Sequence, residues 1–313
     1  MRLVAGPTTF RPFVKRQYWR PEGNAGLIFG DSAQHQRALA TEPGFHNVLG
    51  VESAFQSRPL DMDFIRPASP YHHLKGLSTQ IYRRFLEPRL KRIPKSAAAL
   101  DAGCGIGRFT PLLAERFRKV VAFDPSWSSL RACRRHLREQ GLGHVDLRWA
   151  DLSFLDSWPA ESFDVVLGME LIGYTNDPLC SLRRLIRVAK PGALILLSLE
   201  ARPGALCAQA PSTPERLRSA LAGEPFLVPG DRYVRYFDLA AFRKLLRRAH
   251  LSDVVIEPSH YLGEGPFWQA IDDARLGDPA YAARVLRVED YCRTDPQTKA
   301  WARVLSASAR KLH

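Results

Sequence analysis

The sequence predicts an α/β fold, in which a largely parallel sheet carries helices on both faces. Three observations lead to this prediction. Short apolar runs of strand length alternate with amphipathic helical segments between about residues 97 and 200. Turns rich in Gly and Pro separate these segments, and several of the apolar runs end in an acidic residue. Such alternation is typical of parallel sheets, because each parallel strand needs a crossover segment, usually a helix, to bring the chain back.

The first 71 residues (1–71) are expected to form a lid or cap. They are irregular and rich in Pro and Gly, yet they hold too many aromatic residues for a disordered tail. Residues 72–313 then make up the main domain. This domain opens with a helix over 72–92, whose apolar residues recur on one face and which Pro94 ends.

The alternating elements follow in order. Five strands are expected at 97–100, 120–123, 145–149, 163–167 and 193–199, with helices at 108–117, 128–140 and 178–188. After them, Asp238 has the position of an N-terminal cap for a helix that runs to His250. A strand at 254–257, a helical insertion at about 266–298 and a final strand at 301–307 complete a set of seven strands.

The composition is that of a globular protein from a reducing compartment. Hydrophobic residues make up 45% of the chain and charged residues 25%, which is ordinary for such proteins. Five cysteines lie far apart without a C-x-x-C pair, which indicates free thiols and no metal site. The chain has neither an apolar run of about 18 residues nor the hydrophobic core of a secretory signal at its start. We therefore expect a cytoplasmic protein that is not associated with a membrane.

The net charge of +13 raises the question of a nucleic-acid partner. Most of the basic residues are Arg, and many of them form pairs within amphipathic helices rather than one compact tract. The interleaved aromatic motifs of RNA-binding modules do not accompany them. The pattern therefore speaks against nucleic acid, although the charge keeps that alternative open.

A glycine-rich turn follows the first expected strand, with the pattern Asp101-x-Gly103-x-Gly105-x-Gly107. In an open parallel sheet, ligands bind beyond the carboxyl ends of the strands, and glycines let the backbone turn tightly and approach a ligand. The turn is not a dinucleotide fingerprint, because Arg replaces the required third glycine in one register and Thr replaces it in the other. A P-loop is excluded as well, because no Gly-Lys-Ser/Thr follows.

Acidic residues end the next two strands in the same way. Asp124 lies 23 residues after Asp101, close to the spacing of about 20 that is expected of a carboxylate on ribose hydroxyls. Asp151 ends the third strand, where a carboxylate can accept a hydrogen bond from an adenine amino group. Each acid alone is typical of a turn, but the three together with the glycine-rich turn predict a nucleoside-containing cofactor.

Five segments of the chain share one resemblance. They are 100–110 (LDAGCGIGRFT), 123–126 (FDPS), 149–152 (WADL), 162–166 (SFDVV) and 189–193 (AKPGA). In this combination they resemble the motifs of class I S-adenosylmethionine-dependent methyltransferases. The resemblance covers about residues 72–260 and the last strand. It implies a Rossmann-like, seven-stranded sheet and S-adenosylmethionine as the cofactor.

The resemblance also implies roles for individual residues. Asp101 and Gly103 would face the methionine part of the cofactor, and Asp124 the ribose. Asp151 and Leu152 would face the adenine. The complete set of cofactor-binding residues that we expect is Asp101, Gly103, Cys104, Gly105, Gly107, Asp124, Pro125, Asp151, Leu152 and Met169.

The segment 168–174 follows the fourth strand, and in this family that segment faces the reacting methyl group. It holds neither the Asn-Pro-Pro-Tyr motif of enzymes that methylate the amino groups of bases or glutamine nor the Pro-Cys pair of RNA cytosine enzymes. This favours a small, diffusible acceptor as the partner.

Three residues are candidates for catalysis. Tyr174 can stabilise the cofactor's sulfonium by a cation–π contact, or it can pack at the head of the following helix. Glu170 can bind the edge of the cofactor or act as a general base. His72, at the start of the first helix, can take a proton from the acceptor, or it can have a structural role.

We therefore expect a transferase that uses S-adenosylmethionine to methylate an O, N or C atom of a small molecule in secondary metabolism, and that releases S-adenosylhomocysteine. Two alternatives stay open. One is a non-methylating enzyme that resembles azetidine-2-carboxylate synthases, cyclises the aminobutyrate arm of the cofactor and releases methylthioadenosine. The other is an RNA methyltransferase. No metal is expected, and the sequence predicts no particular oligomeric state.

Overall fold

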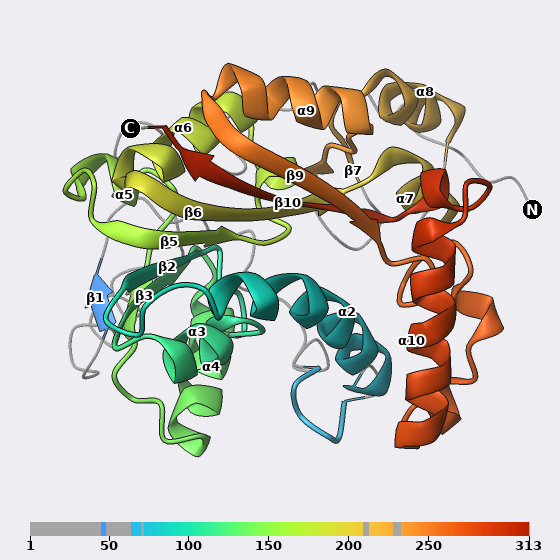
Figure 1. Ribbon diagram of the computed structural model, residues 1–313, viewed down its shortest axis with the longest axis horizontal. Coiled ribbons are helices and arrows are strands. Elements are labelled where there is room, and N and C mark those ends of the chain that lie inside the picture. Colours follow the sequence, from blue (N-terminus) through green and yellow to red (C-terminus); the bar gives the residue numbers. More distant parts are fainter. Residues whose placement is uncertain (1–44, 48–63, 70–71, 209–212, 228–232, 313) are drawn as a thin grey trace, which may run out of the picture.

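The computed structural model describes residues 45–47, 64–69, 72–208, 213–227 and 233–312. Within these ranges the chain forms one large sheet, in the strand order β1-β4-β3-β2-β5-β6-β10-β9, and a small sheet of β7 and β8 (Figure 1). In the large sheet β10 is antiparallel to β6 and β9, and the other neighbouring strands are parallel. The strands are β1 (Phe45–Asn47), β2 (Ala98–Ala102), β3 (Lys119–Asp124), β4 (Asp146–Trp149), β5 (Phe163–Gly168), β6 (Ala189–Glu200), β7 (Phe226–Leu227), β8 (Tyr233–Val234), β9 (Leu251–Ser259) and β10 (Val304–Lys311).

Helices cover both faces of the large sheet (Figure 1). Apolar residues of α2, α3 and α4 share a core with one face, and those of α5, α6 and α9 share a core with the other. No helix among the described residues is long and apolar enough to span a bilayer. The helices are α2 (His72–Leu90), α3 (Thr110–Arg116), α4 (Trp127–Glu139), α5 (Phe154–Ser157), α6 (Pro178–Val188), α7 (Arg202–Ala208), α8 (Pro214–Ala222), α9 (Leu239–Arg248) and α10 (Pro279–Thr294), with 3-10 turns η5 (Ile172–Tyr174), η6 (Trp268–Ala270), η7 (Asp273–Arg275) and η8 (Lys299–Trp301).

Aspartate caps hold the helices that return the chain between strands. Asp177 accepts hydrogen bonds from the first backbone N–H groups of α6. Asp238 accepts one from Ala241 N at 2.7 Å and caps α9, as the sequence predicted. Because β2 to β6 are parallel, the carboxyl ends of the five strands lie along one edge of the sheet. The strand order reverses at β2, which has β3 on one side and β5 on the other, and ligands bind at such a switch point.

The predicted α/β fold is confirmed, and the seven predicted strands correspond to β2–β6, β9 and β10. The final strand begins at Val304, three residues later than predicted, because Lys299–Trp301 form a 3-10 turn. The predicted helical insertion holds two 3-10 turns followed by α10. The short helices α7 and α8 were not predicted.

The predicted lid over residues 1–71 lies largely outside the described residues. Of that segment the structure describes 45–47, 64–69 and no more. Phe45–Asn47 pair in parallel with β4 and extend the edge of the sheet. Residues 64–69 form turns that lead toward α2.

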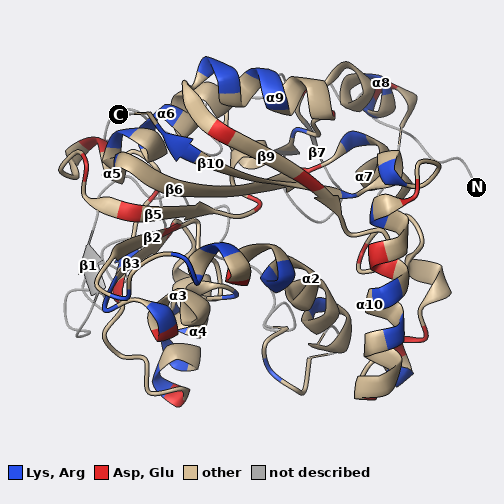
Figure 2. Ribbon diagram, in the orientation of Figure 1, with Lys and Arg blue, Asp and Glu red and all other residues tan. Residues whose placement is uncertain are grey.

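The basic residues are distributed as the sequence indicated. Figure 2 shows Lys and Arg spread over α2, α4, α9 and α10 rather than gathered in one band. Several of them pair with acids, such as Arg184 with Asp156 on the surface between α6 and α5.

Candidate active site

The glycine-rich turn after β2 adopts the backbone conformation that its glycines permit. Gly103, Gly105 and Gly107 have φ angles of 71°, 54° and 84°, in the left-handed region that favours glycine. The N–H groups of Gly103 and Cys104 both donate to the carbonyl oxygen of Phe123 on β3, at 2.9 and 3.0 Å. The turn is therefore tied to the neighbouring strand.

The three glycines differ in what surrounds them. A Cβ atom added to Gly107 would lie 2.7 Å from Cys133 Sγ, and one added to Gly103 would lie 2.9 Å from Leu171 Cδ1. A Cβ atom added to Gly105 would meet no described atom within 4 Å. Gly107 and Gly103 thus allow close packing of the turn, whereas Gly105 presents bare backbone to open space.

The two predicted acids nearest the turn are buried and hold it in place. Asp124 accepts hydrogen bonds from Gly105 N and Ser126 N, both at 2.8 Å. Asp101 accepts one from the Thr110 hydroxyl at 2.7 Å. Burial raises the pKa of Asp101 to about 7, although the bond from Thr110 opposes the shift. Asp101 is therefore a carboxyl group whose ionisation a cationic ligand would favour.

The other predicted cofactor residues lie along the same edge. Asp151 follows β4 and accepts a hydrogen bond from Ser153 N at 2.7 Å, which is the turn role that its position suggested. Leu152 is buried beside it, and Met169 is buried just after β5. The Pro125 carbonyl oxygen accepts a hydrogen bond from Trp149 Nε1 at 2.9 Å. The structure thus brings all ten predicted cofactor residues to the carboxyl ends of β2 to β5.

Next to this group lies a cluster of six charged side chains, which we call the ionic cluster. Its members come from α2, from the turns after β2, β5 and β9, from the end of β6 and from the residue before β10. Lys75 pairs with Glu264, Arg108 lies 3.6 Å from Glu170, and Arg303 lies 3.9 Å from Glu264. The ionic cluster consists of Lys75, Arg108, Arg303, Glu170, Glu200 and Glu264.

Arg108 and Tyr82 hold Glu170 from two sides. The Tyr82 hydroxyl donates a hydrogen bond to Glu170 Oε1, and the Arg108 guanidinium lies over the Tyr82 ring, 5.0 Å from its centroid. Arg108 also donates to Ser78 Oγ at 2.7 Å and faces the Phe64 ring at 5.4 Å. Burial alone would raise the pKa of Glu170, but Arg108 and the other cations prevail and lower it.

His260 is buried beside the ionic cluster. Its Nε2 lies 3.0 Å from Ser78 Oγ, and its ring centroid lies 4.2 Å from that of Tyr82. Burial, together with the charges of Arg108 and Arg303, lowers the pKa of His260 to about 3. Its imidazole is therefore neutral at physiological pH.

Three residues of this edge have left-handed backbone angles that are uncommon outside glycine. They are Glu170, His260 and Glu264, with φ of 51°, 63° and 64°. Strained backbone of this kind costs of the order of 1–3 kcal/mol per residue and is concentrated at functional sites. Because all three residues lie in or beside the ionic cluster, we interpret this edge of the sheet as a functional site.

Tyr174, the first catalytic candidate, has two kinds of contact. Its hydroxyl donates a hydrogen bond to Glu200 Oε1 at the end of β6. Its ring packs against the small core that includes Val234 and Tyr236. The packing role that the sequence left open is thus observed, and a role beside the sulfonium stays a prediction.

His72, the second candidate, stands at the start of α2. Its Nδ1 lies 3.0 Å from the Phe64 carbonyl oxygen, and its ring meets the edge of the His73 ring. The structure thus gives His72 a structural contact, and its role as a base stays a prediction. Glu170, the third candidate, lies within the ionic cluster.

Sequence reasoning missed most of the ionic cluster. Lys75, Arg303 and Glu264 lie in segments that show no local motif. Glu200 could have been found, because it ends β6 as Asp124 ends β3, and Asp101 is the last residue but one of β2.

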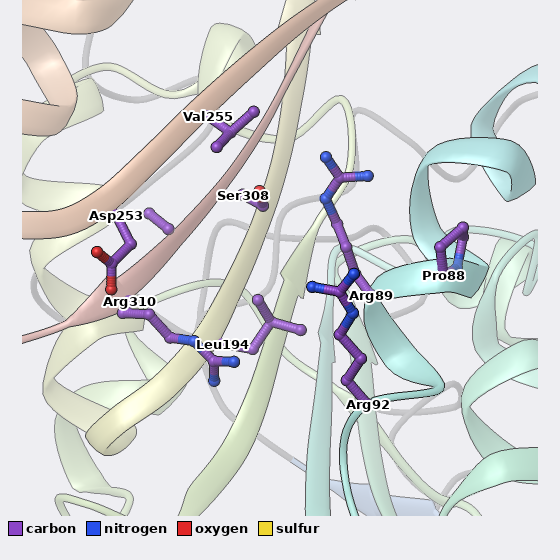
Figure 3. Close-up of a pocket in the computed structure, with 9 residues that line it drawn as sticks. Pro88, Arg89, Arg92, Leu194, Asp253, Val255, Ser308 and Arg310 are labelled. Atoms are coloured by element: carbon purple, nitrogen blue, oxygen red, sulfur yellow. The ribbon is translucent and has the colours of Figure 1, made fainter.

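A pocket lies away from the edge of the sheet that holds the candidate site. A pocket of about 280 Å³ is bordered by Arg89 and Arg92 from the end of α2, Leu194 from β6, Val255 from β9 and Arg310 from β10 (Figure 3). Leu194 belongs to the amino-terminal half of β6, and Arg310 pairs with it. The pocket therefore lies toward the opposite end of the strands from the glycine-rich turn, and it is not part of the candidate site.

Comparisons with known proteins point to one enzyme family. The family model described as a methyltransferase domain matches residues 100–197. The ubiquinone biosynthesis O-methyltransferase of Caulobacter vibrioides is 32% identical over 184 residues, which cover 52% of this chain and 73% of that protein. The enzyme of the same name from Xanthomonas axonopodis pv. citri is 31% identical over 51% of this chain and 63% of its own length. The chain spans about half the length of several other curated relatives that it matches.

Solved structures show the same fold at low sequence identity. The [4+2]-cyclase SpnF aligns with a TM-score of 0.50 and 18% identity, over 84% of this chain and 98% of its own. The phosphoethanolamine N-methyltransferase 2 of Haemonchus contortus, in complex with S-adenosyl-L-methionine, aligns with a TM-score of 0.50 and 15% identity, over 82% of this chain and 61% of its own. At these identities the likeness concerns the fold alone.

Proposed function

We propose that this chain, which belongs to the class I S-adenosylmethionine-dependent methyltransferase superfamily, transfers the methyl group of S-adenosylmethionine to a hydroxyl oxygen of a small molecule. The observation that carries the proposal is the turn at 101–107. A Cβ atom added to Gly105 would meet no described atom within 4 Å, and the buried acids Asp101 and Asp124 each accept a hydrogen bond there, from Thr110 and from Gly105 N. The choice of oxygen rests on the curated relatives, which are named O-methyltransferases.

The residues at this edge fit S-adenosylmethionine. Asp101 would bind the amino group of the methionine part, since its buried carboxyl gains from a nearby cation. Asp124 accepts hydrogen bonds from two backbone amides. A carboxylate has about four acceptor sites, and we propose that ribose hydroxyls bind Asp124 as well. Asp151 and Leu152 would border the adenine. Met169 would lie near the sulfonium.

The cofactor would supply an activated methyl group, so the protein's task is to align the acceptor and to exclude water. Phe64 lies over Lys75 and Arg108, with ring distances of 5.8 and 5.4 Å. The segment that precedes α2 thus covers one side of the ionic cluster. We infer that this segment helps to close the site, and that S-adenosylhomocysteine is the second product.

Glu170 would fix charge and geometry rather than remove a proton. Arg108 and the other cations of the ionic cluster lower its pKa, and Tyr82 already donates to it. A carboxylate with a lowered pKa is a weak base. Its negative charge beside Met169 would instead stabilise the cationic cofactor.

The pathway that we propose is suggested by the names of the relatives rather than by the sequence. The sequence alone favours secondary metabolism, whereas the relatives are named for ubiquinone biosynthesis. These names favour an acceptor from that pathway, and we propose one with a free hydroxyl group.

Turnover of the cofactor tests this function. The protein is incubated with S-adenosylmethionine and with each of a panel of catechols and other phenols, and release of S-adenosylhomocysteine is measured. We expect release that depends on the hydroxyl compound and that stops when its hydroxyl is replaced by hydrogen. Release that needs an amine, or no acceptor at all, would contradict the proposal.

A further inference from the structure

Resting on the proposed function, we infer that Glu200 is the group that takes the proton of the acceptor hydroxyl, and that the site selects an acceptor that is electrically neutral when it binds. Glu200 ends β6 and is 3% exposed. Three observations carry the inference: its place, a free carboxylate oxygen and the charge balance around it.

The place of Glu200 is beside the end of β5. Gly168 pairs with Leu197 across the two strands, and Glu170 N donates to both the Oγ and the carbonyl oxygen of Ser198. Glu200 therefore ends β6 next to the turn that begins with Met169. In the proposed function this turn lies beside the reacting methyl group, so Glu200 is close to where the acceptor oxygen must lie.

One oxygen of Glu200 has no partner. Oε1 accepts the hydrogen bond from the Tyr174 hydroxyl. In the part of the chain that the structure describes, no group donates to Oε2. Gly173 lies alongside, because a Cβ atom built on it would be 3.5 Å from Oε2. Buried polar atoms are rarely left without a partner in proteins, and an O–H group of a ligand would satisfy this one.

The charges around Glu200 balance. With Glu200 ionised, the ionic cluster holds three cations and three carboxylates, and the neighbouring His260 is neutral. The groups that act on Glu200 are Tyr174 from η5, Glu170 from the turn after β5 and Arg303 from the residue before β10. A neutral acceptor leaves this balance intact, whereas a carboxylate or an ammonium group would add an uncompensated charge to a buried site.

The proposed reaction step conserves atoms, electrons and total charge. The O–H bond of the acceptor breaks and its proton forms a bond to Glu200 Oε2, while the acceptor oxygen forms a bond to the methyl carbon. The bond from that carbon to the sulfonium breaks, and its electron pair stays on sulfur, which becomes neutral. Glu200 afterwards releases the proton to water. The negative charge of Glu200 and the positive charge of the sulfonium thus cancel in the step, and the methylated acceptor is neutral like the acceptor itself.

Glu200 and Glu170 differ in their suitability as a base. Burial raises the pKa of Glu200 to about 7, with a further increase from Glu170, and Arg303 opposes the shift. A general base works best when its pKa lies near the working pH. Arg108 and the other cations of the ionic cluster keep Glu170 ionised. Glu200, rather than Glu170, therefore takes the proton.

The variant Glu200→Gln tests the inference, with Glu257→Gln as the matched control. Glu257 lies on β9, pairs with Arg89 of α2 and is not a member of the ionic cluster. A phenol that the native chain methylates serves as the probe, at saturating cofactor. We expect Glu200→Gln to lower kcat at least about 100-fold, with cofactor Kd within about twofold of native. The control should keep its kcat, and Glu200→Asp should recover part of the loss.

The pH profile of the native chain provides a second measurement, which does not depend on the folding of a variant. At saturating cofactor, kcat/KM for the acceptor should fall about tenfold per pH unit below pH 7. In Glu200→Gln, the residual kcat/KM should no longer fall as the pH drops below 7. Near-native turnover in Glu200→Gln, or a native profile that stays flat down to pH 5, would overturn the inference. A native chain that methylates no hydroxyl compound would refute the proposed function instead, and the inference with it.

Discussion

The hydroxyl group of Tyr82 donates a hydrogen bond to Glu170 Oε1, and it thereby joins helix α2 to the turn after β5. Tyr82 is 1% exposed and Arg108 covers its ring. This contact connects the helix that follows the N-terminal segment with the turn where the methyl group is expected to react. The hydrogen bond therefore makes the position of the turn after β5, where the acceptor is expected to bind, dependent on α2.

Tyr82→Phe removes that hydrogen bond and leaves the shape of the ring unchanged. Hydrogen bonds to charged groups contribute about 1.5–3 kcal/mol, so we expect a loss of about 2 kcal/mol in the free energy of unfolding. Tyr261→Phe is the control, because its hydroxyl donates to a neutral acceptor, the Lys299 carbonyl oxygen, at 3.0 Å, where about 1 kcal/mol is expected. Urea denaturation measures the free energy of unfolding of both variants. Equal losses in Tyr82→Phe and Tyr261→Phe would show that Tyr82 does not donate a hydrogen bond to an ionised Glu170.

Glu264→Gln removes one partner of a buried ionic network. Burial opposes ionisation of Glu264, but Lys75 and Arg303 prevail and lower its pKa to about 2, from an ordinary value of 4.5. Glu264 therefore stabilises the fold above pH 4.5, and this stabilisation is lost as the pH falls toward 2. We expect a loss of about 3 kcal/mol at pH 7. The loss should shrink as the pH falls from 4.5 toward 2.

The control for this variant is Glu87→Gln. Glu87 pairs with Arg83 on the exposed side of α2, where such pairs contribute less than about 0.5 kcal/mol. Chemical denaturation of both variants between pH 3 and 7 checks the difference. A loss for Glu264→Gln that matches the control at pH 7 would contradict the account of the ionic cluster.

The affinity for S-adenosylmethionine should depend on pH through Asp101. Its carboxyl group has a pKa of about 7 in the free protein, and the cationic amino group of the cofactor favours the ionised form. At pH 8 the ionised form is already present, whereas below pH 7 binding must displace a proton. We expect Kd to rise by up to about tenfold per pH unit below pH 7. Calorimetry on native protein and on Asp101→Asn tests this, since the variant should bind weakly at every pH.

Gly105→Ala and Gly141→Ala form a matched pair for the cofactor turn. Both glycines have left-handed φ, 54° and 70°, and neither has a described atom within 4 Å of an added Cβ. Each substitution should therefore cost about 1–2 kcal/mol in backbone strain. Gly105→Ala alone should also weaken cofactor binding, by more than about tenfold, because the methyl group occupies the space that the cofactor needs. Equal Kd values for both variants would place the cofactor elsewhere.

The alternation of strands and helices was predictable because it depends on local periodicity and on turn residues. The start of the last strand was not, because the apolar run at Trp301 and Ala302 looks extended in sequence, while the chain there forms a 3-10 turn before β10. The short helices α7 and α8 escaped prediction because they lack a long apolar face.

The cofactor side of the site was predictable because Asp101 and Asp124 lie at the ends of neighbouring strands and the glycines follow Asp101 directly in sequence. The ionic cluster was not, because antiparallel pairing of β10 with β6 and β9 brings Arg303 beside residues about 40 to 100 positions away. No local pattern marks such a long-range assembly.

The most direct test of the proposed methyl transfer is the fate of the cofactor's methyl group. The chain is incubated with S-adenosylmethionine that carries a trideuterated methyl group, together with a phenol that supports turnover, and the products are identified by mass spectrometry. The account predicts a phenol that has gained the trideuterated methyl on its oxygen, and one S-adenosylhomocysteine for each. Methylthioadenosine with an unchanged phenol would contradict it.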